Sequence, residues 1–426
     1  MLMRDISFYS GLALRVGERG VSAFGVFINS VLIARTLADQ EAAAYFVVVS
    51  VCQLVISPWV AGADYVWIRY RSDGIAPQNA TDRVFMPIVL GSLVSALVSI
   101  AVCVPLLAGT GAFMLLLACA VGNCVFSAIT LQLASKFGQP ARYLAVSVSG
   151  GVLAIGCKLA VLVLAAGEYW IIAALFCEYY LVAALAMLFR PRRTGTGSGA
   201  SASLREFLAL FAGPAFLVVA TIVSLRLALL VTSRTMAAAD YVAFGLAFQV
   251  MNAVSVVSAA VSNSVVASSI GAGGTVASVL AATRRGFIAV AALFTCFAAF
   301  LYAFGQPVLG FLLQARGGGV HKLAMAGLFY SAYVLVLGIC SALASVTHST
   351  RSYSWSLIGM TTLSTAVLAL APVDRLGARI ALWGLTSLVA SLLVSRWLIG
   401  RARPGGAGRS WGGPSVPRPA RKRPSQ

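Results

Sequence analysis

Residues 35–55 read RTLADQEAAAYFVVVSVCQLV, and residues 234–254 read RTMAAADYVAFGLAFQVMNAV. The two stretches align without a gap, and identical pairs such as Arg35 with Arg234 recur along them. Each follows an apolar segment and passes through Arg-Thr and a short acidic turn into another apolar segment. We interpret them as one helical hairpin used twice, which predicts a protein built from two similar halves.

The composition identifies the class of protein. Hydrophobic residues make up 60% of the 426 residues, charged residues only 10%, and the mean hydropathy is +0.93. Soluble globular domains carry about 25% charged residues. The apolar stretches run for about 20 residues, the length of a bilayer-spanning helix, without the strict alternation of a membrane barrel. The sequence therefore predicts an all-α integral membrane protein.

Twelve apolar segments separated by charge, Gly or Pro are candidate spans. They are 11–34, 42–66, 84–108, 112–134, 142–166, 169–189, 206–233, 241–270, 286–313, 323–346, 353–371 and 378–399. The Gly/Ser-rich connection 190–205 is predicted to be a flexible cytoplasmic linker. We expect it to join an N-terminal six-helix lobe, 1–189, to a C-terminal six-helix lobe, 206–400. The basic Pro/Gly-rich stretch 401–426 is predicted to be a disordered cytoplasmic tail.

The net charge of +19 is explained by where the basic residues lie. With twelve spans, the side that holds both termini carries about three times as many Lys and Arg residues as the other. We therefore expect a multi-pass protein of the bacterial inner (plasma) membrane with both termini in the cytoplasm, in contact with anionic lipid and not with nucleic acid. Because six spans per half is an even number, both halves enter the membrane in the same sense, and a substrate path is expected between the lobes.

Charged residues inside the first span need a reason, because a charge at the centre of a membrane helix costs about 2.5–3.5 kcal/mol. Arg15 and Arg19 are four residues apart and share one face of this span, with Glu18 beside them. They could reach the cytoplasmic headgroups. The alternative is a cationic entrance that receives an anionic headgroup.

Three more intramembrane or span-end sites are candidates. Lys158 and Glu178 lie at equal depth on the fifth and sixth spans, which predicts an ion pair; the alternative is that Glu178 couples transport to H⁺ or Na⁺. Arg226 has no acidic residue at matching depth, and Gln249 is the nearest polar candidate, so we expect a water-filled cavity and an anionic ligand. Asp64 lies at the cytoplasmic end of the second span among interfacial aromatic residues, where we expect a structural role. The alternative is that it acts as an ionic switch.

Nothing in the sequence suggests an enzyme. No Walker A motif, zinc motif or Gly-rich nucleotide turn occurs, and the two histidines are far apart. No predicted loop is long enough to hold an active site. We expect no bound cofactor or metal, with H⁺ or Na⁺ as the candidate coupling ions and Glu178, Glu18 and Asp64 as the candidate coupling residues.

The first hairpin resembles that of the polysaccharide flippase family, within the multidrug/oligosaccharidyl-lipid/polysaccharide exporter superfamily. The matching positions are Ala34, Arg35, Leu37, Glu41 and Tyr45, followed by Gly62, Asp64 and Arg69. Ala44 departs from the usual Gly. The resemblance implies a V-shaped pair of six-helix bundles that flips an undecaprenyl-diphosphate-linked oligosaccharide to the outer leaflet by alternating access. By analogy, it makes Arg15, Arg19, Lys158 and Arg226 the candidate residues for the diphosphate.

The resemblance also implies partners: the lipid-linked oligosaccharide, membrane lipids, a polysaccharide polymerase and other assembly proteins. Two other functions stay open. A drug/cation antiporter of the same superfamily would be expected to place carboxylates in its cavity, whereas the intramembrane excess here is positive. An integral-membrane glycosyltransferase or polymerase would be expected to carry a large periplasmic domain, and the sequence has no segment for one.

Overall fold

The computed structural model describes residues 17, 20–21, 23–72, 77–107, 140–164, 170, 204–271, 276–346, 349–370 and 375–401. These residues form helices and short connections between them, and this part of the chain contains no strand. A first helix covers Ala23–Thr36. It is followed by α2 (Asp39–Ser72), α3 (Pro77–Leu107), α5 (Pro140–Val163), α7 (Leu204–Thr232), α8 (Ala238–Asn252), α9 (Ser255–Gly271), α10 (Val276–Leu313), the 3₁₀ turn η1 (Gln314–Arg316), α11 (Gly317–Ala326), α12 (Leu328–Val346), α13 (Thr350–Leu370) and α14 (Leu376–Arg401).

The helices match the predicted spans. Six segments are long and apolar enough to cross a membrane, and four shorter apolar helices accompany them. They fall on ten of the twelve predicted spans; the other two, 112–134 and 169–189, lie outside the described residues except for residue 170. Most of the predicted linker 190–205 and of the predicted tail 401–426 lies outside them as well. The all-α prediction is confirmed.

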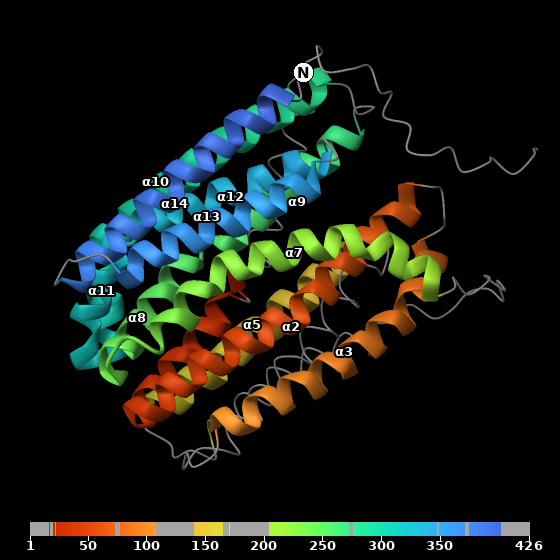
Figure 1. The fold of residues 1–426 in the computed structure, drawn as a ribbon. Helices are drawn as coiled ribbons and strands as arrows, with labels where there is room; N and C mark the ends of the chain where they lie inside the picture. The colour runs from red at the N-terminus through yellow and green to blue at the C-terminus, as the bar shows by residue number, and fades with distance from the viewer. Residues whose placement is uncertain are drawn as a thin grey trace, which may run out of the picture.

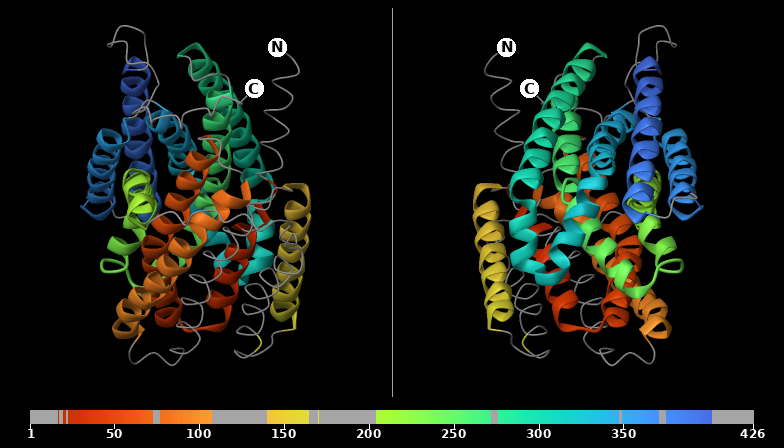
Figure 2. Two further views of the ribbon diagram at one scale, coloured as in Figure 1. Left: turned by 90° about the vertical axis from the view of Figure 1, so that its right-hand side faces the viewer. Right: turned by 90° about the vertical axis from the view of Figure 1, so that its left-hand side faces the viewer.

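The two halves meet along a few helices. Figure 1 shows α2, α3 and α5 on one side of the bundle and α9, α10, α12, α13 and α14 on the other, with α7 and α8 between them. The views in Figure 2 show the long helices running in one general direction. α7 packs along α2 and against α13, while α8 packs against α2, α11 and α12. The junction between the halves is therefore built from α2, α7 and α8.

The outward-facing surfaces of several helices are apolar. Large hydrophobic side chains are exposed on α3, α10 and α14, among them Leu93, Leu97, Phe300, Phe311 and Leu393. In water such a surface would be an aggregation site, whereas in lipid it is the expected contact surface. Hydroxyl groups inside the helices bond back to the preceding turn, as Ser50 Oγ donates to Phe46 O at 2.7 Å. These bonds satisfy polar groups where no water reaches.

Two predicted spans are interrupted. The eighth, predicted as continuous over 241–270, stops at Asn252 and restarts at Ser255. The tenth, predicted to begin at 323 after an outer loop, begins earlier, with α11 directly after η1, and is interrupted at Gly327, where φ is −86° and ψ is 10°. A Cβ at Gly327 would overlap with the sulfur of Met251, so the missing side chain lets α11 and α12 approach the end of α8. Ser331 Oγ donates to Met251 O at 3.2 Å, satisfying a carbonyl next to the break.

Candidate functional site

Arg226 lies on α7 opposite the end of α8. Its side chain is only 6% exposed. The guanidinium lies over the ring of Phe248, with Cζ 5.6 Å from the ring centroid. Its Nη1 is buried and has no hydrogen-bond partner among the described residues. The sequence named Gln249 as the nearest polar candidate, and the contact found for the guanidinium is with the ring of the adjacent Phe248.

Aromatic side chains from three helices surround this arginine. Tyr330 of α12 stacks on Trp383 of α14 with ring centroids 4.1 Å apart, and Phe248 of α8 lies 5.5 Å from Tyr330. Tyr330 Oη donates to Leu225 O at 3.5 Å, on the residue that precedes Arg226. The aromatic cluster thus packs directly beside the α7 turn that carries the guanidinium.

Further polar groups lie close by without a bonding partner. Asn252 is the last residue of α8, and its Oδ1 is buried with no hydrogen bond inside the described part of the chain. The buried hydroxyl of Tyr241 also lacks a partner there. The phenol groups of Tyr241, Tyr330 and Tyr45 lie close enough to Arg226 to interact with it electrostatically. A helix break inside a membrane span is a common position for substrate or ion binding, because it frees backbone and side-chain polar groups.

The energies indicate that Arg226 is not placed for stability. A charge at mid-membrane costs about 2.5–3.5 kcal/mol, and a buried donor without an acceptor costs about 1–3 kcal/mol. A cation–π contact returns about 0.5–2 kcal/mol. The cost of burying Arg226 thus exceeds the gain from its ring contact. A ligand would recover this cost if it offered an anionic or strongly accepting group to the guanidinium and an apolar or aromatic surface to the cluster.

Lys158 has a different environment. Its side chain is fully buried on α5, as predicted, and Nζ donates to Gly25 O of the first helix at 3.3 Å. This contact fastens α5 to the first helix within the N-terminal half. Lys158 therefore contacts the first helix, whereas Arg226 contacts α8.

The remaining predicted site residues are not described. Arg15, Glu18, Arg19 and Glu178 lie outside the described residues, and Asp64 lies in α2 with its side chain outside them. The ion pair between Lys158 and Glu178 thus stays a prediction. In the part of the chain that the structure covers, no three His, Cys, Asp or Glu side chains gather into a metal site.

Sequence reasoning missed the break at Ala253–Val254 and the aromatic cluster. Neither residue at the break is Gly or Pro, so the usual signals of a helix interruption are absent. The weak signal was the run of Val, Ser and Asn that follows, since these residues have modest helix propensity. Tyr330 and Trp383 are unremarkable in the sequence because aromatic residues are common in apolar spans.

The fold is that of known exporters. An outward-facing structure of a multidrug resistance MATE family transporter of the MOP superfamily matches with a TM-score of 0.70 and 14% identity, covering 94% of this chain and 96% of that one. An inward-facing structure of a transporter with the same description matches with a TM-score of 0.64 and 14% identity. The match covers 92% of this chain and 94% of that one. A MOP superfamily transporter from Pyrococcus furiosus matches with a TM-score of 0.63 and 14% identity, covering 94% of this chain and 96% of that one. Its description states that the reversed polarity of its binding pocket suggests a different function.

No protein-family model matches the sequence, and no curated protein matches it. The structural similarity extends over nearly the whole chain, so the predicted twelve-helix, two-lobed architecture is confirmed. The descriptions of the first two neighbours name multidrug transporters, and none of the three names a polysaccharide flippase. They therefore favour the antiporter alternative, and the flippase family stays a prediction. The chain has the fold of the MATE transporters of the MOP superfamily.

Proposed function

We propose that the chain is an alternating-access exporter of amphipathic organic compounds, with Arg226 and the end of α8 forming part of its substrate site. The observation that carries the proposal is a buried guanidinium, with one nitrogen unbonded, beside a helix break at the junction of the halves. The multidrug transporters of the same fold support export as the activity. The aromatic cluster supplies the apolar surface that such compounds require.

The charges indicate which compounds fit. Lys158 and Arg226 are the charged side chains that are buried in the described residues. The described carboxylates, Asp39, Glu41, Glu206 and Asp240, lie in the first turns of their helices. A cationic drug would therefore meet a like charge at Arg226, whereas an anionic or zwitterionic aromatic compound would neutralise it. The reversed polarity described for the Pyrococcus furiosus transporter is a precedent within the fold.

The flipping of a lipid-linked oligosaccharide is the second candidate function. The first-hairpin motif resembles that of the polysaccharide flippases, and arginine binds diphosphate oxygens in a bidentate geometry. Under this function the partners are those of surface polysaccharide assembly in a bacterial plasma membrane. In both cases coupling to H⁺ or Na⁺ through Glu178 is our proposal for the energy source.

Transport into proteoliposomes distinguishes the two functions. The probes are an anionic aromatic dye, a cationic aromatic dye and a fluorescent polyprenyl-diphosphate sugar, each assayed with an imposed pH or Na⁺ gradient. We expect transport of the anionic dye by the unaltered chain and its loss in Arg226→Gln. Arg396→Gln is the matched control, because Arg396 is an exposed arginine near the end of α14.

Three outcomes would change the proposal. Flipping of the diphosphate lipid without dye transport would establish the second candidate. Transport of the cationic dye alone would overturn the anionic specificity. Unchanged anionic transport in Arg226→Gln would remove Arg226 from the site.

A further inference from the structure

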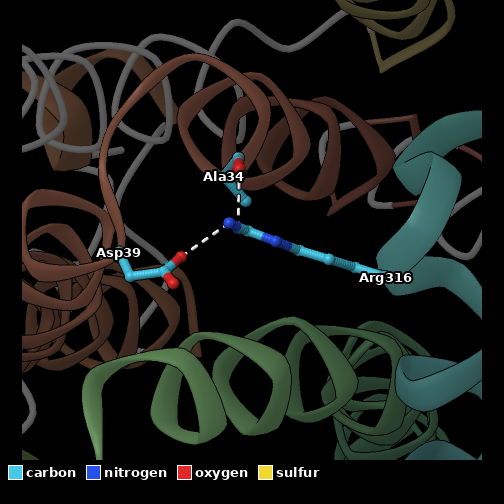
Figure 3. A network of polar contacts seen from close by, with 3 residues as sticks. All are labelled: Ala34, Asp39 and Arg316. Carbon is cyan, nitrogen blue, oxygen red and sulfur yellow. Dashed lines mark hydrogen bonds and ion pairs between the residues drawn. The ribbon is translucent and has the colours of Figure 1, made fainter.

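Arg316 connects the two halves of the molecule at one end of the bundle (Figure 3). It is the last residue of η1, directly after α10 of the C-terminal half. Its Nη2 forms an ion pair with Asp39 Oδ1 at 2.6 Å, and its Nη1 donates to Ala34 O at 2.7 Å. Ala34 and Asp39 belong to the N-terminal half, on either side of the turn between the first helix and α2. We call this three-residue contact the Arg316 clamp.

The local chemistry favours a guanidinium in this position. Ala34 lies in the last turn of the first helix, where carbonyl groups lack helical partners and the helix end carries partial negative charge. Asp39 opens α2 and adds a full negative charge nearby. Arginine can serve both acceptors at once through its two terminal nitrogens. Gln314, two residues before Arg316, has φ 53°, a left-handed conformation that is uncommon for a residue other than glycine.

A second contact between the halves joins α2 to α8. Phe46 of α2 meets Tyr241 of α8 edge-to-face, with ring centroids 6.5 Å apart. The same Phe46 ring fills the space left by Gly245, where an added Cβ would come within 2.9 Å of it. The distribution of loop charges predicts that this end faces the outside of the cell. The clamp and the aromatic contact therefore hold the halves together at the predicted outer end.

We propose that the Arg316 clamp is the polar latch of the outer gate, which must separate before the substrate path can open to the outside. The inference rests on the alternating access of the proposed function. The Arg316 and Asp39 side chains are 38% and 36% exposed, so water and salt reach the ion pair. A half-exposed pair of this kind shifts a conformational equilibrium about two- to fivefold, enough to bias a gate without locking it.

The test measures the separation of the halves directly. Spin labels at Val104 of α3 and Leu370 of α13, both exposed and near the predicted outer end, report the distance between the halves in lipid nanodiscs by pulsed dipolar spectroscopy. Cysteine-depleted full-length protein carries the labels. We expect Arg316→Ala to raise the ratio of long to short distances about two- to fivefold. Asp39→Asn should give a smaller increase, because the bond to the Ala34 carbonyl remains.

Salt supplies an independent readout. High salt should raise the long-distance population in the unaltered protein, because it screens the ion pair, but should have less effect in Asp39→Asn. Lys322→Gln and Asp240→Asn are the matched controls, since each removes an exposed charge from the same end without touching the clamp. Both should keep the original distances.

Three results would overturn the proposal. One is an unchanged distance distribution in Arg316→Ala, and another is an equal shift in the two control variants. The third concerns sidedness: the variant Gly319→Cys, at an exposed position on α11, must react with impermeant maleimide added to whole cells. Reaction only in inverted vesicles would mean that the clamp closes the cytoplasmic end. Because the distance measurement needs no substrate, it stands or falls independently of the transport assay.

Discussion

The two copies of the repeated hairpin have the same sequence pattern but different structures. The first copy, 35–55, runs into the continuous helix α2. The second, 234–254, runs into α8, which stops at Asn252. The copies also face each other, and the aligned residues Phe46 and Gly245 touch. Where duplicated helices meet near a pseudo-two-fold axis, two equal side chains would compete for the same space, so one is large and the other is absent.

The divergence between the copies also determines where the candidate site lies. Gln53 and Asn252 are aligned, but only the second is followed by a helix break, and Arg226 and the aromatic cluster lie beside that second copy. The duplication accounts for the fold, while the site depends on positions at which the copies differ. The predictions below test differences between the copies and the site beside the second copy.

The pairing of Phe46 with Gly245 should give the largest effect on stability. Gly245→Phe places a ring against the ring of Phe46, and overpacking of this kind costs about 3 kcal/mol. Thermal unfolding in detergent should show this loss of stability. The exchanged variant Phe46→Gly/Gly245→Phe should recover part of it. Gly359→Phe is the control, because a Cβ there meets nothing within 4 Å. Equal losses at both glycines would show that the fit between the copies is not special.

Arg226 should show opposite effects on stability and activity. Arg226→Met removes a buried charge and keeps much of the volume, which should raise the free energy of unfolding of the substrate-free protein by about 1–2 kcal/mol. The same variant should lose transport of the anionic dye. Thermal unfolding with and without the dye measures both effects. A loss of stability of similar size would instead identify Arg226 as a structural residue.

The helix break gives a matched pair of variants. Asn252→Ala removes the buried Oδ1 and should weaken apparent substrate affinity by about fivefold, equivalent to about 1 kcal/mol. Gln53→Ala, at the aligned position of the continuous helix, should leave affinity unchanged. Transport rates against substrate concentration compare the two. Equal losses would mean that the break does not distinguish the copies.

The smallest effect is expected at Tyr330. Tyr330→Phe removes the bond to Leu225 O but keeps the ring stacked on Trp383. Because that bond is long, at 3.5 Å, we expect a loss of about 0.5 kcal/mol in the free energy of unfolding. Tyr302→Phe, on an exposed tyrosine of α10, is the control and should be neutral. A loss well above 1 kcal/mol would show that the hydroxyl has a larger role.

Much of the fold could be predicted because membrane helices follow directly from apolar length. The ten described spans, the duplicated hairpin and the burial of Lys158 and Arg226 all follow from positions of charge within long apolar runs. The break after Asn252 could not be predicted, since neither Ala253 nor Val254 is Gly or Pro. Arg316 falls between the predicted ninth and tenth spans, 286–313 and 323–346. Its partner Asp39 is distant in sequence, and a single sequence carries no information on such pairs.

The meeting of the two helix interruptions has a mechanical consequence. α8 ends where α11 gives way to α12, and α8 packs against α11. At both points shorter turn bonds perturb the α-helical ladder: Ala253 N–H donates to Val250 O at 3.2 Å, and Gly327 N–H is shared between Leu323 O and Ala324 O at 3.0 and 3.2 Å. A helix bends most readily where its ladder is perturbed in this way. We therefore expect bending of the eighth and tenth spans to occur at these two points, with α8 and α11 moving together because they pack against each other.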